Sequence, residues 1–256
     1  MTILFDRNGP VATITINRPE ARNAINPETA ALLVDAFTEF DTDPSLSVAV
    51  LTGAGETFCA GYDLKNAAVQ DTRAIYEPEG PGLLGISRMT LQKPVICAVE
   101  GFAVAGGLEI ALWCDLRIAS KTAVFGVFCR RWGVPLIDGG TVRLPRLIGH
   151  SRALDMILTG RPVAADEALT FGLANRVVAG GDALAAAQHL AAEVSRFPQI
   201  CLRTDRLSSY RQWGHSTEEA LRLEGRDGAK PLFEEAANGA ARFASGKGRA
   251  GSFADI

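Results

Sequence analysis

Two glycine-rich segments stand out as places where the backbone itself could bind an anionic oxygen. One is AGYDL at 60–64, which follows an apolar run, and the other is the Gly106-Gly107 pair, which follows a second apolar run. Glycines at the start of a helix leave backbone N–H groups unpaired at the positive end of the helix dipole. Two such donors from separate turns can converge on a carbonyl oxygen that becomes an oxyanion. Taken alone, each turn is better explained by close packing of a helix against a strand.

Glu109 favours the chemical interpretation because it lies in an apolar stretch that predicts a buried helix. Its neighbours at helical spacing are Ala105, Gly106, Leu112 and Trp113. A carboxylate in such surroundings is rarely buried without a partner or a role. Burial would raise its pKa and suit it to proton transfer. The alternative is a structural ion pair with an arginine.

The short motifs of several enzyme classes are absent from the chain. It contains no GxGxxG after a predicted strand, no Walker loop, no HExxH and no GxSxG. Nucleotide-dependent hydride transfer, nucleotide hydrolysis, zinc-dependent hydrolysis and serine-esterase chemistry therefore lose their usual sequence support.

Charge and hydropathy argue against nucleic acid and membrane as partners. Lys and Arg number 26 against 29 Asp and Glu, which gives a net charge of −3. This balance provides no general attraction to nucleic acid or to an anionic membrane. No segment reaches the run of about 20 apolar residues that a membrane-spanning helix needs.

The N-terminus and the cysteines indicate a cytoplasmic protein. The first ten residues, MTILFDRNGP, lack the basic segment and apolar core of a signal peptide. The five cysteines are odd in number and never spaced as CxxC, which is typical of reduced thiols rather than of disulfides or a zinc site.

The elements that must position these residues alternate between strands and helices over the first two thirds of the chain. Apolar runs predict strands over 11–17, 48–52 and 94–99, and helical spacing predicts helices over 28–40 and 106–113. The DLRIAS segment at 115–120 is predicted as a further strand. The polar segment 66–90 is predicted as a loop with at most one helix.

Helices dominate the predicted structure from residue 141 onward. We expect two over 141–160, one from 164, then 183–197 and 217–238, with a short strand around Val177. The sequence therefore predicts an α/β protein with two parts, a core over 1–195 and a helical region over 196–256.

Several segments in order resemble the crotonase (enoyl-CoA hydratase/isomerase) superfamily over nearly the whole chain. They are INRPEARNAIN at 16–26, AGYDL at 60–64, KPVICAVEGFAVAGGLEIALWCDLRIAS at 93–120, FG at 125–126, GGTVRLPRLIG at 139–149 and LTGRPVAADEALTFGLAN at 158–175. The resemblance implies a spiral of ββα turns with a C-terminal helical region, assembled as a homotrimer or a dimer of trimers. It implies an acyl-CoA substrate held by the 1–195 core, with no metal and no cofactor beyond the CoA thioester itself.

The resemblance also assigns roles to particular positions. The backbone N–H groups of Tyr62 and Gly106 would form the oxyanion hole, and Glu109 would be the first of two catalytic acids. CoA would be bound by Ala21, Arg22, Ala60 and Lys65, with phosphate contacts from Lys247 or Arg249 in the tail.

The sequence departs from the hydratase pattern where the second catalytic glutamate is expected. Cys129 occupies that position, and a buried cysteine is a poor general acid. Asp138 is the candidate replacement, since dienoyl-CoA isomerases of the superfamily use an aspartate at a similar place. Its alternative role is to cap the helix predicted to begin near Gly139. Arg130 and Arg131 follow the cysteine and are interpreted either as ion-paired residues or as an electropositive patch for a polar acyl group.

These features favour an enzyme that hydrates an enoyl-CoA through a stabilised enolate. Two alternatives remain open at this point. One is an enoyl- or dienoyl-CoA isomerase that uses Asp138, and the other is a non-catalytic acyl-CoA-binding homologue, because Cys129 replaces an acid.

Overall fold

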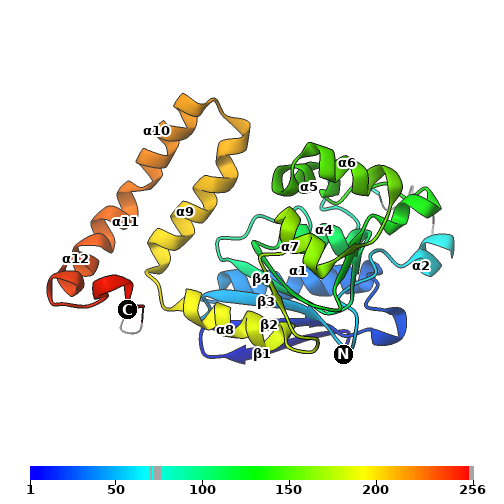
Figure 1. Cartoon of the computed structure of the whole chain (residues 1–256), viewed down its shortest axis with the longest axis horizontal. Coiled ribbons are helices and arrows are strands. Elements are labelled where there is room, and N and C mark those ends of the chain that lie inside the picture. Colours follow the sequence, from blue (N-terminus) through cyan, green and yellow to red (C-terminus); the bar gives the residue numbers. More distant parts are fainter. Residues whose placement is uncertain (70, 72–75, 254–256) are drawn as a thin grey trace.

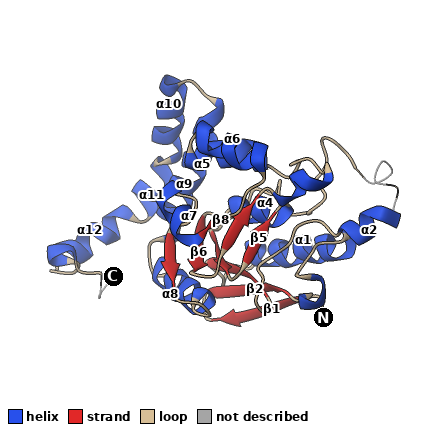
Figure 2. Cartoon of the chain, turned by 45° about the vertical axis from the view of Figure 1, so that its right-hand side comes forward, coloured by secondary structure: helices blue, strands red, loops and turns tan. Residues whose placement is uncertain are grey.

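A six-stranded sheet forms the base of the molecule (Figures 1 and 2). The computed structural model describes residues 1–69, 71 and 76–253 of the 256-residue chain. The strand order is β1-β2-β3-β4-β6-β9, with β1 antiparallel to β2 and every other neighbouring pair parallel. These strands are β1 (Ile3–Asn8), β2 (Val11–Ile16), β3 (Val48–Gly53), β4 (Val95–Val99), β6 (Leu116–Ser120) and β9 (Arg176–Val178).

A smaller sheet lies beside the first and carries the turns that matter for the site. It consists of β5 (Phe102–Val104), β7 (Val124–Gly126) and β8 (Val163–Ala164) in the order β5-β7-β8. Val104, the last residue of β5, pairs with Gly126, so the small sheet ends two residues before Gly106. The small sheet thereby fixes where the Gly106-Gly107 turn begins.

Helices cover both faces of the large sheet, which explains why the central strand β3 is buried at every residue. Helix α8 (Ala183–Ser195) packs on one face against Val48, Val50 and Ile96. Helices α1 (Pro27–Thr42) and α4 (Gly106–Trp113) cover the other face.

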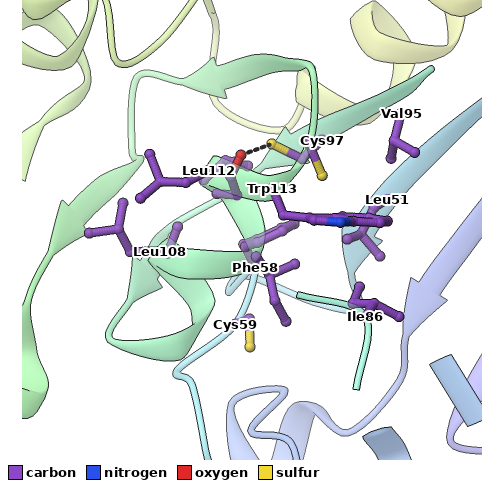
Figure 3. Close-up of a cluster of buried hydrophobic side chains, with 14 of the residues drawn as sticks. Leu51, Phe58, Cys59, Ile86, Val95, Cys97, Leu108, Leu112 and Trp113 are labelled. Atoms are coloured by element: carbon purple, nitrogen blue, oxygen red, sulfur yellow. Dashed lines mark hydrogen bonds between the residues drawn. The ribbon is translucent and has the colours of Figure 1, made fainter. Parts of the chain in front are cut away.

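Helix α4 is apolar all round because it is enclosed on every side. All eight of its residues are buried, Glu109 included. Figure 3 shows Trp113 of this helix beside Leu51 of β3, with Val95 and Cys97 of β4 nearby. The indole of Trp113 packs edge-on against Phe37, with ring centroids 4.9 Å apart, and its N–H donates to the Met89 carbonyl. The helix that carries Glu109 is therefore held rigidly.

Most of the remaining helices follow the sequence predictions, but the helix over Gln199–Arg211 was not predicted, and the prediction over 217–238 needs correction. The remaining helices are α2 (Leu64–Val69), α5 (Gly140–Ile148), α6 (His150–Thr159), α7 (Ala165–Phe171), α9 (Gln199–Arg211), α10 (Thr217–Asp227), α11 (Ala229–Glu234) and α12 (Ala236–Ala244). The single helix predicted over 217–238 is wrong, because the chain there forms α10, α11 and the start of α12. Gly228 follows α10 and Pro231 lies in α11, and both residues have low helix propensity.

Several short elements were not predicted from the sequence. Strand β1 consists of three apolar residues followed by three polar ones, which is neither an apolar run nor an alternation, and β5, β7 and β8 span only two or three residues each, too few for a periodic pattern. The segment predicted as a loop over 66–90 contains the end of α2 and otherwise no helix or strand in its described part; residues 70 and 72–75 lie outside the description.

The C-terminal helices extend away from the sheets. In Figure 1, α9 runs beside α10 to α12 on the left of the molecule, while α2 lies at the opposite side. In the described residues, no helix is both long enough and apolar enough to cross a membrane.

Candidate active site

One cavity of about 560 Å³ brings together residues that are up to 120 positions apart in the sequence, from Arg18 to Asp138. It lies where the 20–24 and 60–65 segments, the start of α4, and the 128–138 segment meet. All eight predicted site residues line it: Ala21, Arg22, Ala60, Tyr62, Lys65, Gly106, Glu109 and Asp138. Cys129 lines it as well.

The Tyr62 and Gly106 backbones meet at one wall of this cavity. Gly61 has φ of +96°, and a Cβ at that residue would lie only 2.7 Å from the Gly106 nitrogen. A larger residue at position 61 would therefore separate the two turns. Neither the Tyr62 N–H nor the Gly106 N–H donates to an acceptor in the part of the chain that the structure describes. Gly106 is also the first residue of α4, where the helix dipole is positive. The wall is thus suited to bind an anionic oxygen.

Ala105 holds this arrangement at some conformational cost. It has φ of +53° and ψ of −125°, a conformation that a residue with a Cβ rarely adopts. Its N–H donates to the Gly126 carbonyl, so the small sheet fixes the residue that precedes Gly106. Nothing in the sequence distinguishes this alanine from its neighbours.

Glu109 faces the turn that precedes α5. It is only 3% exposed, and its Oε1 accepts hydrogen bonds from the N–H groups of Asp138 (2.9 Å) and Gly140 (2.8 Å). Glu109 forms no ion pair with any described arginine, so the structural ion pair considered from the sequence is wrong. Burial raises the pKa of Glu109 to about 7, and the nearby Asp138 charge adds to this effect, while the two N–H donors oppose it. Its proton is therefore exchangeable near neutral pH.

Asp138 is a second buried carboxyl group in the cavity. Its Oδ1 accepts hydrogen bonds from the Ser87 hydroxyl and from the Leu84 N–H. Burial raises the pKa of Asp138, and the Ser87 hydrogen bond opposes that shift. The helix-cap interpretation is wrong, because Gly139 precedes α5 and no side chain caps that helix. The Asp138 side chain points instead toward the 84–87 segment.

Two arginines, the partly buried Arg143 and the exposed Arg88, connect the 84–88 segment to the turn at 137–138. Arg143 donates to the carbonyls of Ser87 (2.6 Å) and Asp138 (3.1 Å), and Arg88 donates to the Ile137 carbonyl (3.0 Å). Leu84 lines the cavity from the same segment. Ser87 was not predicted from the sequence because it lies in a polar segment without periodicity.

Cys129 lies in a 3-10 helix over 128–132 and cannot easily take the place of a carboxylic acid. Burial and the neighbouring Glu109 charge raise the pKa of its thiol. Arg130 donates to the Ile157 carbonyl, whereas Arg131 stacks 4.8 Å from the Phe128 ring and lines the cavity. Neither arginine pairs with a described carboxylate, so the ion-pair interpretation of these two residues is wrong.

The other end of the cavity carries exposed cations. Arg22 and Lys65 line it, and neither side chain has a polar partner among the described residues. The Ala60 N–H donates to the Arg22 carbonyl (3.1 Å), which joins the two predicted CoA-binding segments.

Asn23 connects the backbone segments at this end of the cavity by hydrogen bonds and was not predicted from the sequence. It is fully buried with φ of +55°; its Oδ1 accepts from the Arg18 N–H, and its Nδ2 donates to the carbonyls of Ala54 and Thr57. Asparagine is among the few residues besides glycine that tolerate this conformation. The feature of the sequence that could have identified Asn23 is its position in a polar turn, directly after the predicted CoA-binding residue Arg22.

Lys247 and Arg249 do not reach the cavity of their own chain. They follow α12 at the C-terminal end, where Arg249 lies over the Phe243 ring, 5.8 Å from its centroid. Figure 1 places this end opposite to α2. The predicted tail contacts are therefore not made within one chain.

Comparison with known proteins shows which family this chain is similar to. The profile of the family described as enoyl-CoA hydratase/isomerase matches residues 6–243. The chain is 37% identical over 247 residues to the enoyl-CoA hydratase EchA19 of Mycobacterium tuberculosis, covering 94% of this chain and 92% of that protein. It is 44% identical over 181 residues to the (E)-benzylidenesuccinyl-CoA hydratase of Thauera aromatica, covering 70% of each.

A solved structure shows the same fold. The enoyl-CoA hydratase of Mycobacterium tuberculosis H37Rv superimposes with a TM-score of 0.89 at 35% identity, covering 95% of this chain and 96% of that one. The predicted spiral fold with its C-terminal helical region is confirmed. Sequence, fold and the order of the motifs together establish that this chain belongs to the enoyl-CoA hydratase/isomerase family of enzymes.

Proposed function

We propose that this protein hydrates an enoyl-CoA thioester. The observation that carries the proposal is the meeting of two unpaired backbone N–H groups and the buried Glu109 in one cavity. The thioester oxygen binds to the N–H groups of Tyr62 and Gly106. These donors stabilise the negative charge that develops on this oxygen during addition.

Glu109 activates the water in this mechanism. Its ionised carboxylate accepts a proton from water as the water oxygen attacks C3 of the enoyl group. The electron pair of the C2–C3 double bond moves toward the thioester and forms an enolate. Because Oε1 is occupied by two backbone donors, Oε2 is the oxygen that receives the proton.

Asp138 supplies the proton that completes the addition at C2. Its buried position keeps it protonated to higher pH than an exposed aspartate, which is the state that a proton donor needs. The Ser87 hydroxyl and the Leu84 N–H both bind Oδ1, so Oδ2 carries the transferable proton. In this proposal Asp138 takes over from the acid that Cys129 replaces.

The relatives support the reaction and do not specify the acyl group. Two of them are named as hydratases of CoA esters, and one of these names an aromatic dicarboxylic acyl group. We expect relatives that share the oxyanion wall to catalyse the same reaction. Differences in the rest of the cavity wall are then expected to select different acyl chains.

The proposal is tested by incubating the protein with a panel of enoyl-CoA esters in deuterated water. Hydration adds the mass of one water and leaves one carbon-bound deuterium at C2, which mass spectrometry detects. Isomerisation leaves the formula unchanged except for exchanged deuterium, and it is the second candidate because Asp138 lies in the cavity. Binding without any change of mass would identify a non-catalytic acyl-CoA-binding protein and overturn the proposal.

Asp138→Asn separates proton transfer from loop anchoring. The asparagine oxygen can still accept from Ser87 and Leu84, so we expect the loop and the acyl-CoA affinity to be retained. Turnover should fall by about 10²-fold or more, the usual effect of losing a general acid. Steady-state kinetics and isothermal titration calorimetry measure the two quantities. Unchanged turnover would show that Asp138 only anchors the 84–87 segment.

Arg22 and Lys65 are proposed to bind the CoA phosphates. Since both are exposed, the affinity for CoA should fall as salt rises, because ions screen such contacts. The double variant Arg22→Gln/Lys65→Gln should bind CoA more weakly and show a smaller salt dependence. Lys121→Gln, an exposed lysine away from the cavity, is the matched control and should behave as wild type. Salt-independent affinity of the wild type would contradict this assignment.

We also propose that the chain assembles as a homotrimer or a dimer of trimers. The C-terminal helices expose large apolar side chains at 62–78% of their surface, namely Leu221, Leu232, Phe233 and Phe243. Such a concentration of exposed apolar groups is typical of an interaction surface. Sedimentation equilibrium measures the mass directly, and a monomer at micromolar concentration would contradict the assembly.

A further inference from the structure

One arginine of α5 contacts both segments that carry the proposed proton-transfer groups. Arg143 donates from Nη1 to the Asp138 carbonyl (3.1 Å) and from Nη2 to the Ser87 carbonyl (2.6 Å). It is partly buried and forms no ion pair with a carboxylate among the residues that the structure describes. Taking a guanidinium partly out of water without a counter-ion is unfavourable. The placement of Arg143 therefore calls for an explanation.

The Arg143 guanidinium packs against the turn that holds Glu109. In this turn the N–H groups of Asp138 and Gly140 donate to Glu109 Oε1, and the Asp138 carbonyl accepts from Arg143. Gly139 lies between them with φ of +103°, and a Cβ there would be only 2.0 Å from Arg143 Nη1. The missing side chain at Gly139 lets the guanidinium reach the turn. Loss of Arg143 would free the turn that binds Glu109.

The second hydrogen bond of Arg143 holds the partner of the Asp138 side chain. Ser87 is fully buried, and its hydroxyl donates to Asp138 Oδ1 while its carbonyl accepts from Arg143. One guanidinium therefore holds both the Asp138 backbone and the serine that orients the Asp138 carboxyl group. The planar guanidinium binds two acceptors at a fixed spacing, which the single ammonium group of a lysine cannot enforce.

The positive charge of Arg143 also acts on both carboxyl groups. Burial raises the pKa of Glu109 and of Asp138, and the Arg143 charge is among the groups that oppose this rise in each. Burial lowers the pKa of Arg143 itself, and the groups that face it oppose that shift, namely Tyr210, Glu109, Cys114 and Asp138. Arginine stays protonated at every pH at which the carboxyl groups titrate. Its charge is therefore constant and favours the ionised form of Glu109.

Arg143 reaches these groups from outside the proposed substrate site. It does not line the active-site cavity but lines a second cavity of about 510 Å³, together with Tyr210 and Trp213 at the end of α9. Its effect on the reaction must therefore pass through the turn at 138–140, through Ser87 and through its charge.

We propose that Arg143 is a positioning residue for hydration, because it holds in place both the turn that binds Glu109 and the serine that orients Asp138. This inference rests on the proposed function, since it assigns the two proton transfers to these carboxyl groups. A purely structural link would instead stabilise the fold without changing the pH at which Glu109 ionises.

Arg143→Met removes both hydrogen bonds and the charge while keeping a long unbranched side chain. We expect kcat to fall by about 10²-fold, the effect of displacing a reacting group by about 1 Å. KM should change by no more than a few-fold, because Arg143 does not line the substrate cavity. The inflection of kcat/KM near pH 7 should move to higher pH, because loss of a positive charge favours protonated Glu109.

Arg143→Lys separates the charge from the geometry. It should lower kcat by about tenfold, because one ammonium group does not hold both carbonyls. Its inflection should stay near that of wild type, because the positive charge is retained. Arg146→Met is the matched control, since Arg146 is an exposed arginine of the same helix that stacks 5.0 Å from the Trp213 ring and makes no hydrogen bond within the described residues. Its kcat and its inflection should equal those of wild type.

Infrared difference spectroscopy measures the ionisation of Glu109 without requiring turnover. The carboxyl band that disappears in Glu109→Gln identifies the residue, and its pH titration is then followed in each variant. The other charged or titratable groups near the two carboxyls are Cys129 and Arg88, and all the Arg143 and Arg146 variants retain them. We expect the titration to move to higher pH in Arg143→Met and to stay at the wild-type position in Arg143→Lys and Arg146→Met.

The inference is overturned if folded Arg143→Met keeps the wild-type kcat, if a lower melting temperature is its only change, or if its Glu109 titration is unchanged. Should Arg143→Met fail to fold, an unchanged kcat in Arg143→Lys overturns the inference. Failure of the proposed function has a different signature. If wild type hydrates no enoyl-CoA but the Glu109 titration moves in Arg143→Met, the hydration proposal falls and the control of Glu109 by Arg143 stands.

Discussion

Glu109→Gln is expected to lower the rate of enoyl-CoA hydration by at least about 10²-fold, the usual effect of losing a general base. Glutamine has the same size and retains an oxygen that can accept from the Asp138 and Gly140 N–H groups, so the fold should be preserved. What is lost is the group that accepts the proton of water. The decrease in absorbance of the conjugated enoyl thioester measures the rate. Activity within a few-fold of wild type would show that the two-carboxyl mechanism is wrong, and Cys129→Ala would then be the next variant to examine.

The pH dependence of the same reaction is the control for this assignment. The pKa of Glu109 is about 7, and only its ionised form can accept a proton, so kcat/KM of wild type should rise as pH increases through about 7. This inflection should be absent from the residual activity of Glu109→Gln.

The free energy of unfolding should fall as pH rises through this range, whereas kcat/KM rises. The folded-state pKa of Glu109 lies above its ordinary value of 4.5, so the unfolded chain releases this proton first as pH rises. Glu109 therefore lowers the free energy of unfolding between about pH 4.5 and 7, by about 3 kcal/mol in order of magnitude. Denaturant unfolding should find Glu109→Gln more stable than wild type at pH 8, with a smaller difference at pH 4.5.

Gly106→Pro should abolish hydration, because proline has no N–H to donate to the thioester oxygen. Removing one such donor from an oxyanion hole typically lowers turnover by about 10²- to 10³-fold. Proline is tolerated at the first position of a helix, and Gly106 occupies that position in α4. Circular dichroism and thermal unfolding establish that the variant is folded, and steady-state kinetics then measures the loss.

Gly106→Ala is the matched control because it keeps the N–H. The added Cβ would lie 3.0 Å from the Leu84 side chain and 3.2 Å from the Gly61 Cα, so small shifts of a few tenths of an ångström are needed. We expect a much smaller loss of turnover than for proline. Full turnover in a folded Gly106→Pro protein would refute the oxyanion role, and equal losses in both variants would assign the effect to crowding.

Much of the fold follows from local sequence patterns. The apolar runs at 48–52 and 94–99 correspond to β3 and β4. They were recognisable because a strand that is buried on both faces is a continuous apolar run. Helix α1 began and ended within a few residues of its predicted range, with Asn26 capping it and Pro27 starting it. Short elements such as β5 and β7 escaped detection because three residues form no period, and their pairing depends on strands that are distant in sequence.

The candidate site likewise combines features that are local in the sequence with features that depend on long-range contacts. The sequence by itself determined which residues could do chemistry, because the glycines before α4, the carboxylate within it and the order of the family motifs are local features. Only the tertiary structure decided how those residues are used. Glu109 bonds to the backbone of Asp138 and Gly140, Asp138 bonds to Ser87 rather than capping α5, and Arg143 bonds to the Ser87 backbone. Each of these facts depends on contacts between segments tens of residues apart. Partnership and burial, which set the pKa of a carboxyl group, arise only when those segments pack together.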